Sequence, residues 1–221
     1  MSERSYAYFV TLIGAVCGYV LLHRLFVPTS LTLRNALVQG LLVGWGLAVV
    51  TVEIAARSKA TRINGWVTIF GCGAPGNGML TRAACARIFL GPVNSPAEAM
   101  YWKTQVDGAG HPLSGSHNYI LRFAPGGLPP VGGFWSLTMA DARECFVPNP
   151  IDRYCISDRS ALVSNSDGSV EIYLQNAAPA GHESNWLPAP MGTFRLWLRA
   201  YLPGESILDG TYRVPPVELK Q

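Results

Sequence analysis

Two long stretches without a charged residue constrain this chain more than any other feature of its sequence. They run from Tyr6 to Leu22 and from Asn35 to Val52. A helix rises about 1.5 Å per residue, so each stretch, extended by its apolar flanks, can cross a bilayer core about 30 Å thick. A short polar turn at 28–30 separates the two. The sequence therefore predicts a transmembrane helical hairpin in residues 1–62, with helices at about 6–27 and 35–56.

Charged residues are scarce along the whole chain, which supports a bilayer as part of its surroundings. Asp, Glu, Lys and Arg make up 14% of the 221 residues, against about 25% in typical globular domains. The formal net charge is +3, and no run of Lys and Arg supplies the basic patch that nucleic-acid binding requires. We expect membrane lipid as a partner and no nucleic acid.

Each apolar stretch carries glycines four residues apart, Gly14 and Gly18 in the first and Gly40 and Gly44 in the second. Residues at this spacing share one face of a helix, and small faces let helix backbones approach closely in lipid. These pairs predict packing against other integral membrane subunits, although glycine is also frequent in membrane helices generally. No A-x-A cleavage pattern follows the first stretch, so we expect the hairpin to be retained.

Basic residues near the hairpin bear on its orientation in a cell inner membrane. The two ends of the hairpin carry Arg4, Arg57, Lys59 and Arg62, while the connecting turn carries Arg24 and Arg34. An even number of spans places both ends on one side. The positive-inside rule then favours the cytoplasm for the rest of the chain, by a small margin.

Residues 63–221 show the pattern of a β domain. Gly and Pro number 23 and 16 in the chain, as many short strands with tight turns require. Alternating or apolar runs predict strands at 118–123, 134–139, 170–174 and 193–201. A helical periodicity marks a short helix near 79–90. Helices long enough for parallel crossovers are missing from the pattern, so we expect an antiparallel two-layer sandwich.

The last of these strands has two distinct faces. Because side chains alternate along a strand, the pattern puts one apolar and one basic, aromatic row on opposite sides. Trp and Arg are favoured anchors at protein interfaces, so the second row predicts a partner-facing surface. The apolar row is Phe194, Leu196 and Leu198, and the partner-facing row is Arg195, Trp197 and Arg199.

Several motifs beyond Trp66 carry a family resemblance. They are Phe134–Thr138, Val147–Tyr154, Asp167–Tyr173, Asn185–Pro190 and Leu208–Tyr212. In this order they resemble the domain-of-unknown-function family 1214, over roughly residues 66–217. The resemblance implies a jelly-roll-like sandwich, often joined to a companion domain of unknown function, and no established reaction. Family members are commonly exported, so the resemblance favours the periplasmic side, against the charge count.

The densest polar group lies in a proline-rich loop and offers a second kind of site. Asn149, Asp152, Arg153, Asp158 and Arg159 fall within eleven positions, and an Asp/Arg cluster of this kind can bind a small anion. With His117 from a predicted strand start, four of these residues form a candidate ligand site at the mouth of the sandwich: Asn149, Arg153, Asp158 and Arg159. The alternative is that they brace an irregular loop through paired hydrogen bonds.

Other motifs give weaker signals. Residues 71–76 fit the G-x-G-x-x-G pattern of dinucleotide-binding turns, but no second parallel strand is evident. His111 and His117 lack the third ligand that a metal site needs. The five cysteines contain no C-x-x-C pair, so we expect buried thiols, with a disulfide between Cys145 and Cys155 as the alternative. We expect no metal, no cofactor and no catalytic constellation.

Two functions from different classes follow. The first is a membrane-anchored accessory or structural subunit of a larger membrane protein complex, which contacts its partners through its helices and one face of the β domain. The second is a small-ligand-binding protein, or an enzyme of unknown reaction, that uses the mouth of the sandwich. The lack of a catalytic grouping favours the first and argues against an enzyme.

Overall fold

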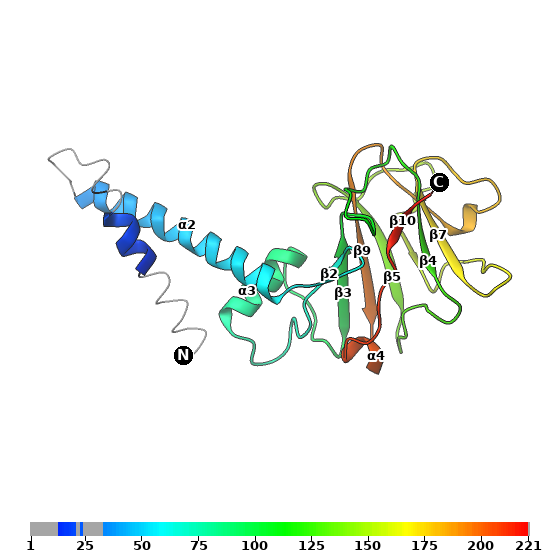
Figure 1. The fold of residues 1–221 in the computed structure, drawn as a ribbon, viewed down its shortest axis with the longest axis horizontal. Helices are drawn as coiled ribbons and strands as arrows, with labels where there is room; N and C mark the ends of the chain where they lie inside the picture. Colours follow the sequence, from blue (N-terminus) through cyan, green and yellow to red (C-terminus); the bar gives the residue numbers. More distant parts are fainter. Residues whose placement is uncertain (1–12, 21–22, 24–32, 221) are drawn as a thin grey trace. The chain divides into compact units, whose positions relative to one another are not determined.

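The computed structural model describes residues 13–20, 23 and 33–220. The chain divides into two compact units. The helical unit comprises Met1–Lys59 and Cys72–Val93, and the β unit comprises Ala60–Gly71 and Asn94–Gln221. Residues 72–93 therefore group with the N-terminal helices, although the chain has already formed two strands before it reaches them (Figure 1).

In the helical unit, helix α2 (Leu33–Lys59) runs beside a helical segment at 13–20. A Cβ atom built on Gly14 would collide with the side chain of Leu47, and one built on Gly18 would lie 2.5 Å from Cγ1 of Val43. Gly14 is next to Leu47 and Gly18 is next to Val43, so residue numbers increase along one segment where they decrease along the other. The two segments are therefore antiparallel. The first glycine pair is thus filled from within the chain.

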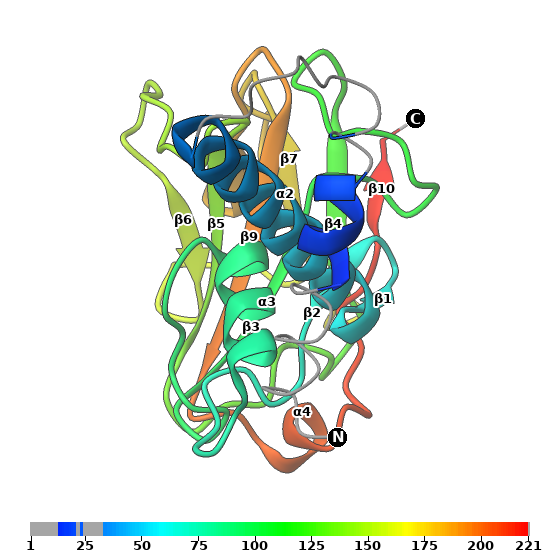
Figure 2. The same ribbon diagram turned by 90° about the vertical axis from the view of Figure 1, so that its left-hand side faces the viewer.

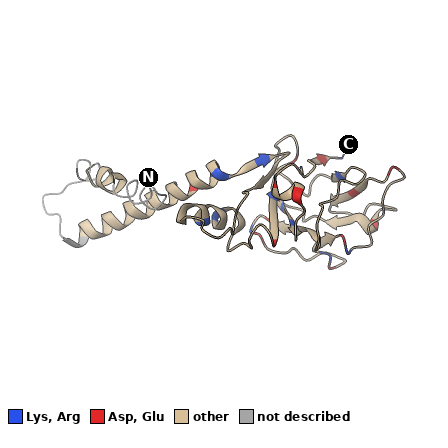
Figure 3. Ribbon diagram, turned by 90° about the horizontal axis from the view of Figure 1, so that it is seen from below, with Lys and Arg blue, Asp and Glu red and all other residues tan. Residues whose placement is uncertain are grey.

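Helix α2 has the character of a membrane span. Among the described residues, one helix is long and apolar enough to cross a membrane, Asn35–Lys59, with a mean hydropathy of 1.8 and none of its most apolar stretch buried. Two basic residues, Arg57 and Lys59, lie in the last turn of the helix (Figure 3).

Of the two predicted membrane-spanning helices, the structure supports one. Of the first predicted helix, residues 13–20 and 23 are described, which is too short a segment to span a bilayer. Its remaining residues and the turn at 28–30 lie outside the described residues. The structure therefore supports one N-terminal apolar helix, as found in membrane anchors and signal sequences.

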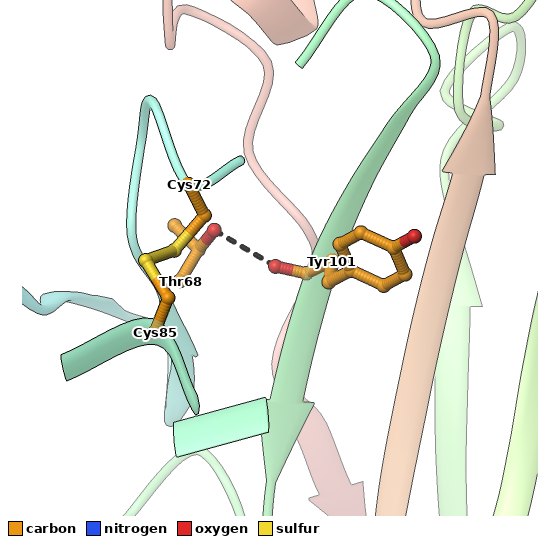
Figure 4. Close-up of a disulfide and its surroundings, with 4 residues drawn as sticks. All are labelled: Thr68, Cys72, Cys85 and Tyr101. Carbon is orange, nitrogen blue, oxygen red and sulfur yellow. Dashed lines mark hydrogen bonds between the residues drawn. A yellow bond between two sulfur atoms is a disulfide. The ribbon is translucent and has the colours of Figure 1, made fainter. Parts of the chain in front are cut away.

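Helix α3 (Met79–Phe89) packs against α2 in the helical unit. Arg87 of α3 forms an ion pair with Glu53 of α2 at 2.8 Å. A disulfide joins Cys85 of α3 to Cys72 in the loop that precedes it (Figure 4). The residue that follows the helix, Leu90, adopts the left-handed conformation with φ 57°.

The disulfide corrects the expectation for the cysteines. Cys72 and Cys85 are bonded to each other, whereas Cys145 and Cys155 are free and exposed, as is Cys17. The cross-link forms because α3 turns back over its preceding loop and brings the two Cα atoms to 5.9 Å, within the range that a disulfide spans. A separation of 13 residues in sequence did not reveal this proximity.

In the β unit, the described residues form two sheets. The first has six strands in the order β1-β2-β3-β9-β5-β6, seen from right to left in Figure 2, and the second has the order β10-β4-β7-β8. The first sheet consists of β1 (Thr61–Ile63), β2 (Trp66–Thr68), β3 (Ala99–Thr104), β5 (Trp135–Asp141), β6 (Cys155–Ser157) and β9 (Phe194–Tyr201). The second consists of β4 (Tyr119–Phe123), β7 (Val170–Gln175), β8 (Trp186–Pro188) and β10 (Val217–Leu219).

The strand pairs are antiparallel with one exception among the described strands. Strands β7 and β8 are parallel, which the prediction of an antiparallel sandwich missed. The connection between them is irregular and contains a single 3-10 turn, η1 (Glu183–Asn185), rather than a crossover helix.

The β1–β2 hairpin turns at Asn64 and Gly65, both at positive φ, as a two-residue turn of type I′ requires. The Thr68 hydroxyl also donates to the Tyr101 carbonyl at 2.8 Å, tying β2 to β3 (Figure 4).

One hydrophobic core lies between the two sheets. Trp102, Leu137 and Leu198 enter it from the first sheet, and Leu121 and Ile172 enter it from the second. Each of these side chains is 5% exposed or less. The interior of the β unit is therefore packed with apolar side chains, and the opposite face of the six-stranded sheet carries its polar residues.

Candidate functional site

The polar side of the six-stranded sheet, which we call the outer face, is ordered by strand register. Lys103 of β3 lies opposite Trp197 of β9, which in turn lies opposite Thr138 of β5. Two residues away, Arg199 occupies the same face. The intervening positions, such as Leu198, point into the core. Strict alternation of side chains thus assembles basic and aromatic groups from neighbouring strands on one surface.

Glu144 reaches this surface from the turn that follows β5. The Asp141 carboxylate holds the turn by accepting the backbone N–H groups of Arg143 and Cys145, each at 2.8 Å. Glu144 itself has a positive φ of 68°, a conformation that is uncommon for residues other than glycine. The turn therefore aims the Glu144 side chain back over the sheet.

Three donors meet the Glu144 carboxylate. Lys103 and Arg195 both contact its Oε1 atom, and the indole N–H of Trp197 donates to Oε2 at 2.6 Å. The side chains of Glu144, Lys103 and Arg195 are 10%, 15% and 28% exposed. The cluster is therefore largely shielded from water, where ion pairs and charge-assisted hydrogen bonds gain strength.

Burial and hydrogen bonding act in opposite directions on this carboxylate. Burial raises the pKa of Glu144, but the hydrogen bonds from Lys103, Arg195 and Trp197 outweigh it and hold the pKa below its ordinary value. Each of these donors stabilises the charged form. Glu144 is therefore ionised at neutral pH, and it offsets part of the positive charge of the face.

Cations and aromatic rings continue along the outer face. The ammonium of Lys103 lies 4.7 Å from the centre of the Trp197 ring, and the guanidinium of Arg199 lies 5.5 Å from it. Arg199 also donates to the Thr138 hydroxyl at 2.9 Å. Further along, Phe134 stacks on Tyr201 with ring centres 4.4 Å apart.

The predicted partner-facing row lies within this arrangement. Arg195 and Arg199 are half-buried, and Trp197 is 8% exposed with its indole N–H bound to Glu144. The face therefore presents the rims of these side chains rather than a protruding tryptophan.

The candidate ligand residues occupy different surroundings. The side chain of Asn149 closes its own loop, accepting from the Arg153 N–H and donating to the Arg153 carbonyl, both at 3.0 Å. The Arg153 guanidinium donates to the carbonyls of Glu183, Ser184 and Trp186. Among the described residues, Arg153 forms no ion pair with Asp158, so the hydrogen bonds of this arginine support the bracing alternative.

The remaining candidate ligand residues lie apart from that brace. Arg159 places its guanidinium 4.5 Å from the centre of the Phe134 ring on the outer face. Asp158 is exposed. His117 is exposed too, with its ring edge-on to Tyr119 at 6.4 Å. Within residues 13–20, 23 and 33–220, no group of three or more His, Cys, Asp or Glu side chains could hold a metal ion.

The glycine-rich segment at 71–76 has the wrong surroundings for a dinucleotide. Strand β2 pairs antiparallel with both β1 and β3, whereas the dinucleotide turn belongs to a parallel βαβ unit. The segment from Gly73 to Asn77 does line a cavity of about 410 Å³ with Arg82 and Ala86 of α3. Its glycines at positive φ shape the loop that the Cys72–Cys85 disulfide holds against α3.

Comparison with known proteins is consistent with this architecture. A model of the family described as protein of unknown function (DUF1214) matches residues 98–205. The match covers β3 to the first residue of helix α4 (Glu205–Leu208), and it supports the resemblance of this segment to that family. No curated protein matches the chain.

Two crystal structures are similar in fold. One is the VPA0106 protein from Vibrio parahaemolyticus, 24% identical, with a TM-score of 0.62 over 88% of this chain and 47% of that chain. The other is an uncharacterized protein from Burkholderia cenocepacia, 14% identical, with a TM-score of 0.39 over 97% of this chain and 49% of that chain. This chain spans about half the length of each, and the Vibrio structure supports the fold alone.

Proposed function

We propose that this protein is a membrane-anchored accessory subunit of a larger membrane protein complex. Its anchor is a transmembrane hairpin formed by α2 and the segment that contains Gly14 and Gly18, and its β unit is a jelly-roll-like sandwich of the DUF1214 family. The observation that carries the proposal is helix α2, whose apolar side chains face outward. Leu41, Leu42 and Trp45 are 73%, 63% and 69% exposed, and exposed apolar side chains of this kind require lipid or a protein partner.

The disulfide supports a periplasmic position for the β unit. Disulfides persist in oxidising compartments and are rare in the cytoplasm. The Cys72–Cys85 bond lies in the helical unit, beyond the basic end of α2. We therefore place the β unit on the periplasmic side of a bacterial inner membrane. The positive-inside count favours the other side by two charges, which is a weak preference beside a covalent bond.

The second glycine pair supports contact with another membrane subunit. Among the described residues, a Cβ atom built on Gly40 or Gly44 would meet nothing within 4 Å, whereas the first pair is filled by Leu47 and Val43. The open pair can admit a helix from another chain, because small residues permit close backbone approach. The packed interior of the β unit favours this function over a ligand site inside the sandwich.

Purification in mild detergent from the native membrane tests the proposal. We expect a stoichiometric protein partner with the wild-type chain and its loss from the Gly40→Ile/Gly44→Ile variant. Gly46→Ile is the matched control, because Gly46 is equally open but lies on another side of α2. Migration of the wild-type chain as a lone monomer would reject the proposal.

The exposed thiols test the sidedness. In a Cys17→Ser variant, a membrane-impermeant maleimide should label Cys145 and Cys155 in cells whose outer membrane has been permeabilised. Labelling that requires lysis of the inner membrane would place the β unit in the cytoplasm instead.

A further inference from the structure

The helical unit contains a cavity beside α3. Its volume is about 410 Å³, within the range of pockets that bind small molecules. The lining comes from the glycine-rich loop at 73–77, from α3 itself and from the chain at 91–93. The Cys72–Cys85 disulfide ties the start of that loop to α3 (Figure 4). A covalent bond therefore connects two of the three segments that form the cavity.

The charged side chain in the lining of this cavity is a cation, Arg82 of α3. Arg82 is exposed, and within the described residues it forms no ion pair, whereas Arg87 of the same helix pairs with Glu53. Residues 72–93 contain neither Asp nor Glu. A guanidinium offers N–H donors in a planar fork that matches the oxygens of a phosphate. The cavity therefore suits an anionic phosphate group.

Helix α2 sets the depth of the cavity relative to the bilayer of the proposed function. At about 1.5 Å of rise per residue, the uncharged stretch Asn35–Val52 is about 27 Å long, close to the ~30 Å thickness of a hydrocarbon core. Glu53 follows this stretch directly and so lies at the level of the lipid headgroups. Helix α3 packs against α2 at the same level, because Arg87 forms its ion pair with Glu53 and because Ala55 and Ala56 are buried.

The surroundings of the cavity combine exposed apolar and exposed basic side chains. Met79 and Leu90, at the two ends of α3, are 54% and 58% exposed. Arg57 in the last turn of α2 is exposed as well. Interfacial helices insert apolar side chains at the acyl boundary and present basic side chains to anionic lipids. Both the charge and the apolar side chains therefore complement an anionic phospholipid.

We infer that the cavity beside α3 binds the headgroup of an anionic phospholipid, with Arg82 on the phosphate. The apolar lining of Ala74, Pro92 and Val93 accommodates the glycerol carbons next to that phosphate. This inference rests on the proposed function, because it requires α2 to lie in a bilayer. It adds to that function a lipid held at a defined site, which secures the helical unit at the membrane surface.

Lipid binding to the full chain tests the inference. The chain is purified in detergent, freed of native lipid and titrated with dioctanoyl-phosphatidylglycerol, while native mass spectrometry measures the bound lipid. We expect saturable binding to the wild type. Arg82→Gln should raise the Kd about 5-fold, as expected for one basic side chain at an anionic lipid surface. Ala86→Phe should raise it by a similar factor, because it fills the cavity without changing the charge.

Three controls make the result specific. Arg87→Gln removes an equal charge from the same helix outside the cavity lining, so it should leave the Kd unchanged. Dioctanoyl-phosphatidylcholine should bind the wild type more weakly than phosphatidylglycerol, because its choline cation opposes Arg82, and this preference should vanish in Arg82→Gln. The soluble ester sn-glycerol 3-phosphate should fail to displace the lipid at equal concentration, because it lacks the acyl chains.

Three outcomes overturn the inference. Equal losses in Arg82→Gln and Arg87→Gln would reduce the binding to general attraction by a basic surface. Wild-type affinity in a folded Ala86→Phe chain would place the lipid outside the cavity. Displacement by sn-glycerol 3-phosphate at equal concentration would identify a soluble phosphate ester as the ligand.

Failure of the proposed function itself gives a different result. The lipid titration needs no protein partner, so it is independent of the copurification test. Release of the wild-type chain from native membranes by alkaline carbonate, without detergent, would reject the anchor on which both proposals depend.

Discussion

Removal of the Cys72–Cys85 disulfide should loosen the helical unit by a predictable amount. The bond closes a loop whose ends are 13 residues apart, and the loop-entropy relation assigns about 3 kcal/mol to a loop of that size. The double variant Cys72→Ser/Cys85→Ser avoids a new lone thiol. Because the bond lies within one of two compact units, we expect the loss at α3 rather than throughout the β unit.

Amide hydrogen exchange of the full chain in detergent measures this loss. A loss of about 3 kcal/mol in the free energy of local opening corresponds to roughly 100-fold faster exchange at the amides of α3. Exchange in β5 and β9 should stay unchanged. The matched control is Cys145→Ser/Cys155→Ser, which removes two thiols that the structure shows as free and should leave α3 unaffected.

A count of reactive thiols is a second, independent test of the disulfide. The denatured, unreduced chain isolated from its native membrane should react with maleimide at three cysteines, and at five after reduction. Five reactive thiols without reduction, or unchanged α3 exchange in the double variant, would refute the argument. The first result would also remove the basis for placing the β unit in the periplasm.

Three further predictions address the Glu144 cluster, the buried Asn185 side chain and the membrane anchor. Folding lowers the pKa of Glu144, so the ionised carboxylate stabilises the fold fully at pH values above its ordinary pKa of 4.5. This stabilisation is lost as the pH falls through the lowered pKa. The difference in melting temperature between the wild type and Glu144→Gln should therefore shrink over that pH range. Asn185→Ala should cost about 1–3 kcal/mol in urea unfolding, because the buried Asn185 amide donates to two main-chain carbonyls at 2.8 Å that would lose their partner. Gly18→Val should abolish cross-linking between cysteines engineered near Gly18 and Val43, since its Cβ would lie 2.5 Å from Val43, whereas Gly44→Val should preserve it.

Local patterns predicted the β architecture well. The strands expected at 118–123, 170–174 and 193–201 are found at Tyr119–Phe123, Val170–Gln175 and Phe194–Tyr201, because period-two alternation is a property of each strand by itself. The parallel β7–β8 pair was missed for the opposite reason. Its pairing depends on the path of a connecting segment that contains no crossover helix, so the sequence holds no helical pattern from which a parallel pair could be predicted.

The sequence predicted part of the candidate site. Alternation along β9 placed Arg195, Trp197 and Arg199 on one face, and the structure keeps them there. Lys103 and Glu144 went unnoticed, because they join the cluster through strand pairing and a turn. Neither residue stands near β9 in sequence, so no spacing rule could link them. The positive φ of Glu144 likewise comes from tertiary structure and not from its residue type.

The polar loop at 149–159 shows why residue density alone is a poor guide to a binding site. Proline at 148 and 150 removes two backbone donors, so the loop must find its hydrogen bonds in side chains. The Asn149 amide serves the main chain of its own loop, and the Arg153 guanidinium serves three carbonyls around η1. A side chain already committed to buried or half-buried main-chain groups is costly to redirect to a ligand. On the outer face, by contrast, Lys103, Arg195 and Trp197 contact the carboxylate of a side chain, Glu144, rather than main-chain groups. The outer face is therefore the better candidate, although the loop carries the denser polar sequence.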